Sequence, residues 1–191
     1  MGDLSSQYLG LFSFPGETKL ETLVLGNRTN GYYNPNFSAL SIGNAAPQLK
    51  LLDISNTQLK STVDLSNCQN IQKVFACGSS ITSVSLPSYG VLEELRLPTT
   101  VTSLVMDNQT HLTIDKFTIG TYDSTTDTYS NATTMNLLNI SIEGMPQFDS
   151  YALVKANAQF SLMRYCLRDV SWTVSAADIV DTVNEDGLKG I

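Results

Sequence analysis

A short pattern of apolar positions recurs along most of the chain. Each copy has one apolar residue, a second three positions later and a third two positions after that. The copies are Leu20-Leu23-Leu25, Leu49-Leu52-Ile54, Ile71-Val74-Ala76, Leu92-Leu95-Leu97, Ile114-Phe117-Ile119, Met135-Leu138-Ile140 and Leu167-Val170-Trp172. The middle residues of the five central copies follow at steps of 22, 21, 22 and 21 residues (positions 52, 74, 95, 117 and 138). A fixed step of this length predicts a solenoid, in which each coil buries its apolar face only against its neighbours.

The spacing within each copy predicts a β-strand. The second and third apolar residues are two positions apart, so their side chains point to the same side of a strand. One strand per copy predicts a parallel sheet of about seven strands with one stacked apolar column: Leu52, Val74, Leu95, Phe117 and Leu138. A second series of short apolar segments lies about midway round each coil: Leu40-Ile42, Val63-Leu65, Val84-Leu86 and Leu104-Met106. This series predicts extended return strands in the middle coils.

Two longer steps interrupt the repeat. The step of 29 residues from Leu23 to Leu52 contains a Gly-, Asn- and Tyr-rich stretch at 27–36, which is typical of a loop. The step of 32 residues from Leu138 to Val170 contains apolar residues at helical spacing, which predicts a helix at about 150–163. The expected fold is therefore α/β but mostly β, with a helix near the C-terminus. We divide the chain into an N-terminal capping segment, a solenoid, and a capping helix or start of a further domain: 1–19, 20–174 and 175–191.

Composition excludes several classes of function. The net charge is −7, and only 11 residues are Lys or Arg, which argues against nucleic-acid binding because that requires clustered basic side chains. No apolar run approaches the roughly 20 residues of a membrane-spanning helix. The first residues lack the basic and apolar parts of a secretion signal, so we expect none there.

The residues that could carry chemistry are few and scattered. The three cysteines, Cys68, Cys77 and Cys166, show no paired spacing and are best interpreted as reduced, packed thiols. The single histidine, His111, stands in a turn without a nucleophile motif nearby. The acidic loop at 123–127 lacks the central Gly and terminal Glu of a calcium loop. We therefore expect no enzyme activity, no metal site and no cofactor.

The variable positions between the apolar residues define one candidate binding face. In the predicted sheet they stand side by side on the outer surface, and the candidates are Leu51, Asp53, Lys73, Phe75, Glu94, Arg96 and Thr118. Aromatic and Arg side chains are common anchors of protein interfaces. Lys73, Glu94 and Lys116 would form a ladder of alternating charge across neighbouring strands. The alternative is that this ladder, and the packing of Phe75, only fix neighbouring strands.

Two resemblances extend this interpretation. The copy at 49–59 resembles the leucine-rich repeat, with Thr57 at the position where that family usually has Asn or Cys. Several stretches also resemble the repeat region of large minor structural proteins of tailed gut bacteriophages: 19–27, 52–57, 63–68, 97–104, 167–172 and 187–191.

The phage resemblance implies a non-enzymatic structural or interaction module of the virion. Such a module would belong to the tail or a fibre-like assembly, be made in the host cytoplasm, and serve assembly or host attachment. Its expected partners are other virion proteins, or a protein or glycan on the host surface, and assembly would make the chain oligomeric. The alternative is a fragment of a bacterial cell-surface leucine-rich repeat adhesin, whose secretion signal would lie on an N-terminal part absent from this sequence.

Overall fold

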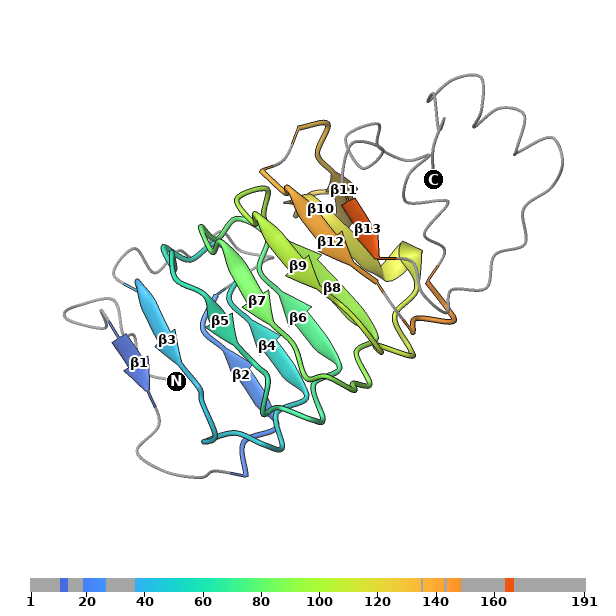
Figure 1. Cartoon of the computed structure of the whole chain (residues 1–191). Helices are drawn as coiled ribbons and strands as arrows, with labels where there is room; N and C mark the ends of the chain where they lie inside the picture. Colours follow the sequence, from blue (N-terminus) through green and yellow to red (C-terminus); the bar gives the residue numbers. More distant parts are fainter. Residues whose placement is uncertain are drawn as a thin grey trace, which may run out of the picture.

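The described residues form a mostly-β solenoid with parallel sheets (Figure 1). The computed structural model describes residues 11–13, 19–26, 37–134, 136–142, 144–148 and 164–166. Within these ranges the helical structure is a single 3₁₀ turn, η1 (Ile114–Lys116). The predicted loop at 27–36, the helices expected at about 150–163 and after residue 174, and the last copy of the repeat lie outside the described residues.

The main sheet contains the strands that the repeat predicts. Its order is β11-β10-β8-β6-β4-β2, with bounds β2 Thr22–Val24, β4 Leu51–Asp53, β6 Lys73–Phe75, β8 Glu94–Leu97, β10 Phe117–Asp123 and β11 Thr128–Asn131. All neighbours pair in parallel except β11, which pairs antiparallel with β10. The register places one apolar residue of each parallel strand in a single column: Leu23, Leu52, Val74, Leu95 and Phe117. The predicted stacking is confirmed for Leu52, Val74, Leu95 and Phe117, and Leu23 extends the column.

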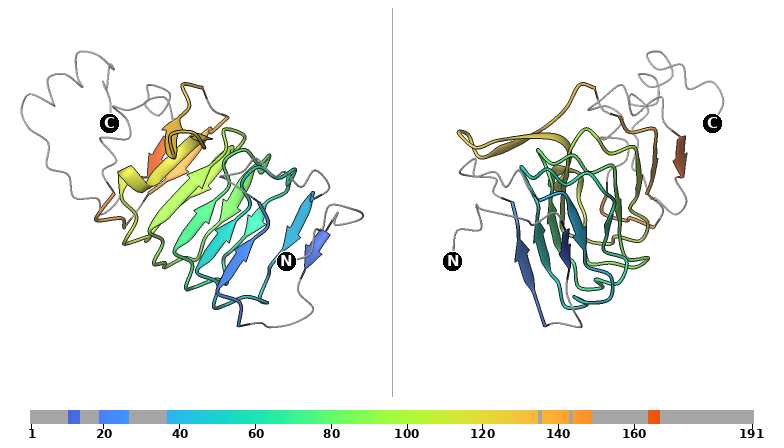
Figure 2. Two further views of the ribbon diagram at one scale, coloured as in Figure 1. Left: turned by 180° about the vertical axis from the view of Figure 1, so that it is seen from behind. Right: turned by 90° about the vertical axis from the view of Figure 1, so that its left-hand side faces the viewer.

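The return strands form a second sheet, which faces the first across the core (Figure 2). Its order is β13-β12-β9-β7-β5, with bounds β5 Val63–Asp64, β7 Ser83–Ser85, β9 Ser103–Val105, β12 Asn139–Ser141 and β13 Arg164–Cys166. A further strand, β3 (Ala39–Ser41), lies next to β5 and pairs in parallel with β1 (Leu11–Ser13). Three successive coils of the solenoid each contribute one strand to the main sheet and one to the second sheet: β4 and β5, β6 and β7, and β8 and β9. Extended return strands were predicted for these coils, and they are confirmed.

The core lies between the two sheets because both present the apolar side of their alternation inward. Leu52, Val74 and Leu95 of the main sheet and Leu104 of the second sheet are almost fully buried in one continuous cluster. Each fully buried aliphatic side chain of this kind contributes about 1.5–3 kcal/mol relative to an exposed one. The continuous cluster, rather than any single coil, therefore holds the solenoid together.

The sixth copy of the repeat does not lie in the main sheet, which corrects the expected sheet of about seven parallel strands. Ile140 pairs with Leu104 of the second sheet, and Leu138 is 73% exposed whereas Leu137 is 1% exposed. The reason is the hairpin of β10 and β11, which occupies the stretch that forms return strands in earlier coils. The next strand of the solenoid, β12, is consequently a return strand, although its sequence distance matches the period.

Turn residues of successive coils stack on one another. Asn56 and Gly78 both have positive φ, 55° and 77°, and a Cβ at Gly78 would collide with the side-chain oxygen of Asn56. Glycine is therefore required at position 78 by both backbone conformation and space. Thr57 donates its hydroxyl to the carbonyl of Ile54 at 2.8 Å. Through this bond the Thr57 side chain satisfies a backbone carbonyl of the turn.

Candidate functional site

The structure brings the seven predicted binding residues onto one face. The register aligns Asp53, Phe75, Arg96 and Thr118 in one row, and Leu51, Lys73 and Glu94 in the next. Both rows point away from the core between the sheets, because they alternate with the buried apolar column. The sequence therefore predicted correctly which side chains share the outer face of the main sheet.

The expected exposure of this face is wrong. Asp53, Phe75, Arg96 and Thr118 are only 5%, 2%, 6% and 3% exposed, and Leu51, Lys73 and Glu94 are partly buried. The hairpin of β10 and β11 projects on the outer side of the main sheet (Figure 2). The ring of Tyr129 in β11 stacks on Phe75, with centroids 6.3 Å apart and planes at 17°, and also packs against Tyr122 of β10 at 4.8 Å.

Arg96 is held from four sides. Its Nε donates to Glu94 Oε1 at 2.9 Å, Nη1 donates to Thr118 Oγ1 at 2.7 Å, and Nη2 donates to the carbonyl of Asp115 at 3.0 Å. Its guanidinium also lies 4.6 Å from the centre of the Tyr129 ring. A buried cation is tolerated only when it is paired and hydrogen-bonded in this way. These contacts give Arg96 a structural role.

The predicted charge ladder of Lys73, Glu94 and Lys116 is absent. Within the part of the chain that the structure describes, no ion pair joins Lys73 to Glu94, although the two residues are neighbours in register. The Glu94 carboxylate instead binds Arg96, two residues along the same strand, and Lys116 lies 4.0 Å from Asp115. The fixed fork of a guanidinium matches a carboxylate better than a flexible ammonium does.

Three acidic side chains at the ends of strands accept hydrogen bonds from backbone amides. Asp53 Oδ1 accepts from the amide of Ser55 at 3.0 Å, and Asp64 Oδ1 accepts from the amide of Ser66 at 3.0 Å. Asp123 accepts from the amide of Thr125 at 2.8 Å, and this bond holds the pKa of Asp123 below its usual value. The acidic loop at 123–127 is thus the turn of the β10–β11 hairpin.

The thiols and the histidine show no reactive arrangement. Cys68 lies in the core cluster, and burial raises its pKa to about 11. Cys77 is buried outside that cluster, two residues after β6, and burial raises its pKa to about 12. His111 is exposed in its turn, as predicted. No group of three or more potential metal-ligating side chains occurs among the described residues.

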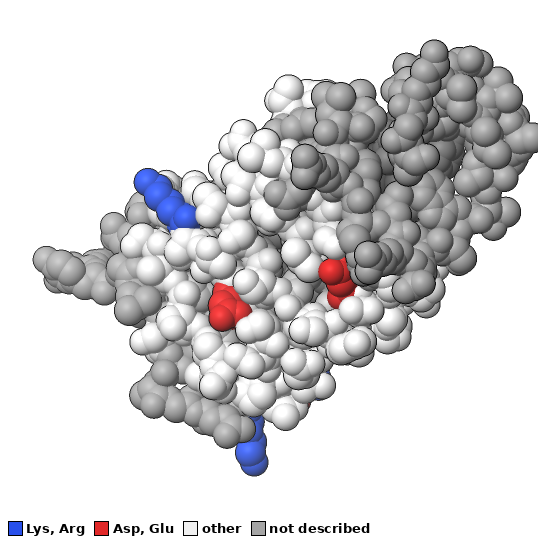
Figure 3. Space-filling model, viewed as in Figure 1, with Lys and Arg blue, Asp and Glu red and all other residues white. Residues whose placement is uncertain are grey.

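The outer face of the second sheet is exposed to solvent, and none of the predicted binding residues lies on it. Thr62 and Ser85 are exposed along it, Ser83 and Ser103 are partly exposed, and Val105 is 53% exposed. This face carries few charged side chains (Figure 3). The signal in the sequence is a polar residue on each side of Val63, Val84 and Ile140, although Val105 follows Leu104 in β9; such alternation is typical of a strand with one solvated face.

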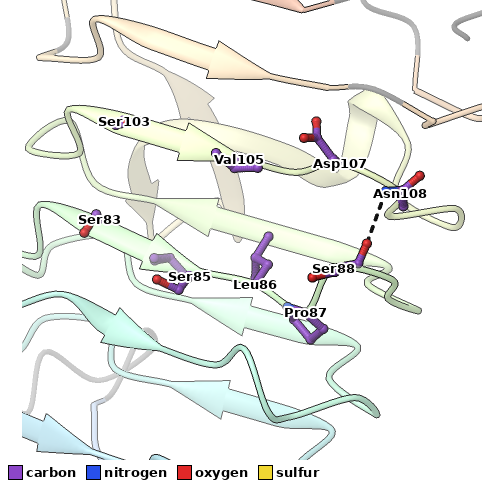
Figure 4. Close-up of a pocket in the computed structure, with 10 residues that line it drawn as sticks. Ser83, Ser85, Leu86, Pro87, Ser88, Ser103, Val105, Asp107 and Asn108 are labelled. Atoms are coloured by element: carbon purple, nitrogen blue, oxygen red, sulfur yellow. Dashed lines mark hydrogen bonds between the residues drawn. The ribbon is translucent and has the colours of Figure 1, made fainter. Parts of the chain in front are cut away.

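A shallow groove of about 510 Å³ lies on this face over the paired strands β7 and β9 and the turns that follow them (Figure 4). Four serines, Ser83, Ser85, Ser88 and Ser103, line it together with Val105 and the turn residues Asp107 and Asn108. The amide nitrogen of Asn108 donates to the carbonyl of Ser88 at 3.2 Å, which ties together the turns that follow the two strands.

Neither the described helical structure nor comparison with known proteins assigns a role to the chain. Among the described residues, no helix has the length and apolar character needed to cross a lipid bilayer. Comparisons of the chain with protein-family models, with curated proteins and with solved structures give no match.

Proposed function

We propose that this chain is a non-enzymatic interaction module that docks on a partner through the outer face of its second sheet. The observation that carries this proposal is the exposed surface over β5, β7 and β9, on which few of the side chains in view are charged (Figure 3). Depletion of charged residues is typical of the centre of protein interfaces. Because the strands are locked in register by the continuous core, this face is presented as one rigid unit.

The proposed setting is the tail or a fibre-like assembly of a phage virion. Support comes from the resemblance of the repeat stretches to large minor structural proteins of tailed gut phages. In that setting the partner is another virion protein or a molecule of the host surface. The assignment of the repeat to the leucine-rich type belongs to the same proposal, supported by the step of 21 or 22 residues and by the Thr57 turn bond.

The first test asks where the chain occurs. Purified particles of the phage that encodes it are analysed by quantitative mass spectrometry and by electron microscopy with an antibody against the chain. The proposal expects the chain in particles at a fixed copy number, located on the tail. Its absence from particles, with the chain in the cell envelope of a bacterium instead, would contradict the proposal and support the adhesin.

The second test asks whether the second sheet is the docking face. A Ser41→Arg/Thr62→Arg double variant places two bulky charges on this face, at exposed positions of β3 and just before β5. We expect its copy number in particles to fall at least about tenfold, because charge at an interface centre must be desolvated. The matched control is Thr121→Arg/Thr126→Arg, exposed on the hairpin of the other sheet. Equal incorporation of the two variants would exclude the second sheet as the docking face.

A further inference from the structure

The residues that line the groove over β7 and β9 offer both hydrogen-bonding groups and apolar surface. Serine hydroxyls both donate and accept hydrogen bonds, and four of them border the groove together with the Asn108 amide, which also does both. Leu86, Pro87 and Val105 contribute apolar surface to the same hollow (Figure 4). A ligand that matches this lining carries several hydroxyl groups and also has an apolar face.

The charge of the residues that line the groove restricts the class of ligand further. No Lys or Arg lines the groove, and its one charged residue is Asp107. A phosphate, sulfate or carboxylate ligand would therefore meet an acidic group without any compensating cation. A metal ion is disfavoured as well, because Asp107 Oδ1 already accepts from Ser141 Oγ at 2.7 Å and no cluster of ligating side chains is found in the described chain. Electrostatics thus favours an uncharged ligand.

The polar groups at the end of the groove are fixed before any ligand arrives. Asn108 has a φ of 59°, which sets its turn, and its side chain is bonded to Ser88. The neighbouring Gln109 is fully buried and donates to the carbonyl of Pro87 at 2.8 Å. Asp107 is held from the adjacent strand β12 by Ser141. Such preorganisation lowers the entropic cost of binding a small polar ligand.

We propose that this groove is a binding site for a neutral saccharide. Hydroxyl-rich rings with apolar faces satisfy the serine, amide and aliphatic lining together, and about 510 Å³ lies within the range of roughly 300–1,000 Å³ of ligand sites. The inference rests on the proposed docking role of this face and names a class of molecule that it recognises.

The test uses the whole chain and defined sugars. Maltotriose, cellotriose, mannotriose and triacetylchitotriose are titrated and followed by saturation-transfer NMR, with 3′-sialyllactose and inorganic phosphate as anionic comparisons. We expect saturable binding of at least one neutral trisaccharide and weaker binding of both anions. Absence of saturable neutral binding, or tighter binding of an anion, would overturn the proposal.

Two variants locate the site. Ser85→Arg fills the groove from an exposed strand position and should lower the affinity at least about tenfold. Asn108→Gly keeps the positive φ but removes the amide, and should lower the affinity about three- to tenfold, as expected for one hydrogen bond. Thr126→Arg on the hairpin is the control and should bind like the parent chain. Unchanged affinity in Ser85→Arg, with circular dichroism showing an intact fold, would exclude this groove.

The outcomes separate this inference from the proposed function. If no sugar binds but charges at positions 41 and 62 still block incorporation into particles, the saccharide site is wrong and the docking face stands. If a neutral sugar binds in the groove but the chain is absent from particles, the saccharide site stands and the virion role is wrong.

Discussion

At the scale of single residues, Arg96 determines the role of the side chains around it on the outer face of the main sheet. Arg96 is 6% exposed, yet its guanidinium binds a carboxylate, a hydroxyl, a carbonyl and an aromatic ring. Glu94 and Thr118 are accordingly partners of Arg96 and not independent contact residues of a surface. Thr118, which would be a solvated position on an open sheet, should therefore matter for stability.

Removing the Arg96 side chain should destabilise the protein strongly. Arg96→Ala leaves the largely buried carboxylate of Glu94 without its cation, and breaking such a pair typically costs about 3–5 kcal/mol. Because Glu94 keeps some contact with water, we expect the lower end, about 3 kcal/mol. Urea denaturation followed by circular dichroism measures the loss. Lys73→Ala on the neighbouring strand should cost less than about 1 kcal/mol, and equal costs would refute the role of Arg96.

At the scale of elements, the β10–β11 hairpin is the departure from the repeat. It continues one strand of the main sheet past Ile119 and returns antiparallel, so that the next strand to enter the solenoid belongs to the second sheet. The shift also changes which leucine of the pair at 137–138 enters the core. Leu137 is in the buried cluster and Leu138 is exposed.

This arrangement predicts opposite results for two adjacent leucines. Leu137→Ala should lower the free energy of unfolding by about 2–5 kcal/mol through lost burial and a cavity. Leu138→Ala should change it by less than about 1 kcal/mol, since the side chain is solvated. Leu95→Ala in β8 is a reference with a loss like that of Leu137→Ala. A larger loss for Leu138→Ala than for Leu137→Ala in urea denaturation would restore the sixth copy to the main sheet.

At the scale of the whole molecule, the two buried thiols report on the packing of the solenoid, Cys68 inside the core cluster and Cys77 outside it. Cys68 and Cys77 lie in adjacent coils, and burial raises their pKa values from 9.0 to about 11 and about 12. The folded state therefore holds these protons at pH values where the unfolded chain has lost them. Stability from this source is complete below pH 9.0 and is lost as the pH rises toward 11 and 12.

Chemical modification of Cys68 and Cys77 should require global unfolding of the protein. In a Cys166→Ser background, a disulfide reagent at pH 8 should leave Cys68 and Cys77 unmodified until urea unfolds the protein, because both are buried. The urea concentration at the midpoint of unfolding should decrease as the pH is raised from 8.5 to 10.5. The decrease should be smaller when Cys77 is also replaced by Ala. Rapid labelling of either thiol without urea, or a midpoint that rises over this pH interval, would contradict the buried assignment.

The sequence alone determined the repeat, the strands of five copies and the return strands, because each depends only on the alternation of apolar and polar positions within one coil. It also determined which side chains share the outer face of the main sheet, because register in a parallel solenoid follows directly from the period. The tertiary structure alone decided that this face is covered, since Tyr129 reaches Phe75 and Arg96 from a hairpin that the period does not reveal. For the same reason it decided the sheet of β12 and left the second sheet as the open surface: burial depends on contacts between distant segments, which no local pattern encodes.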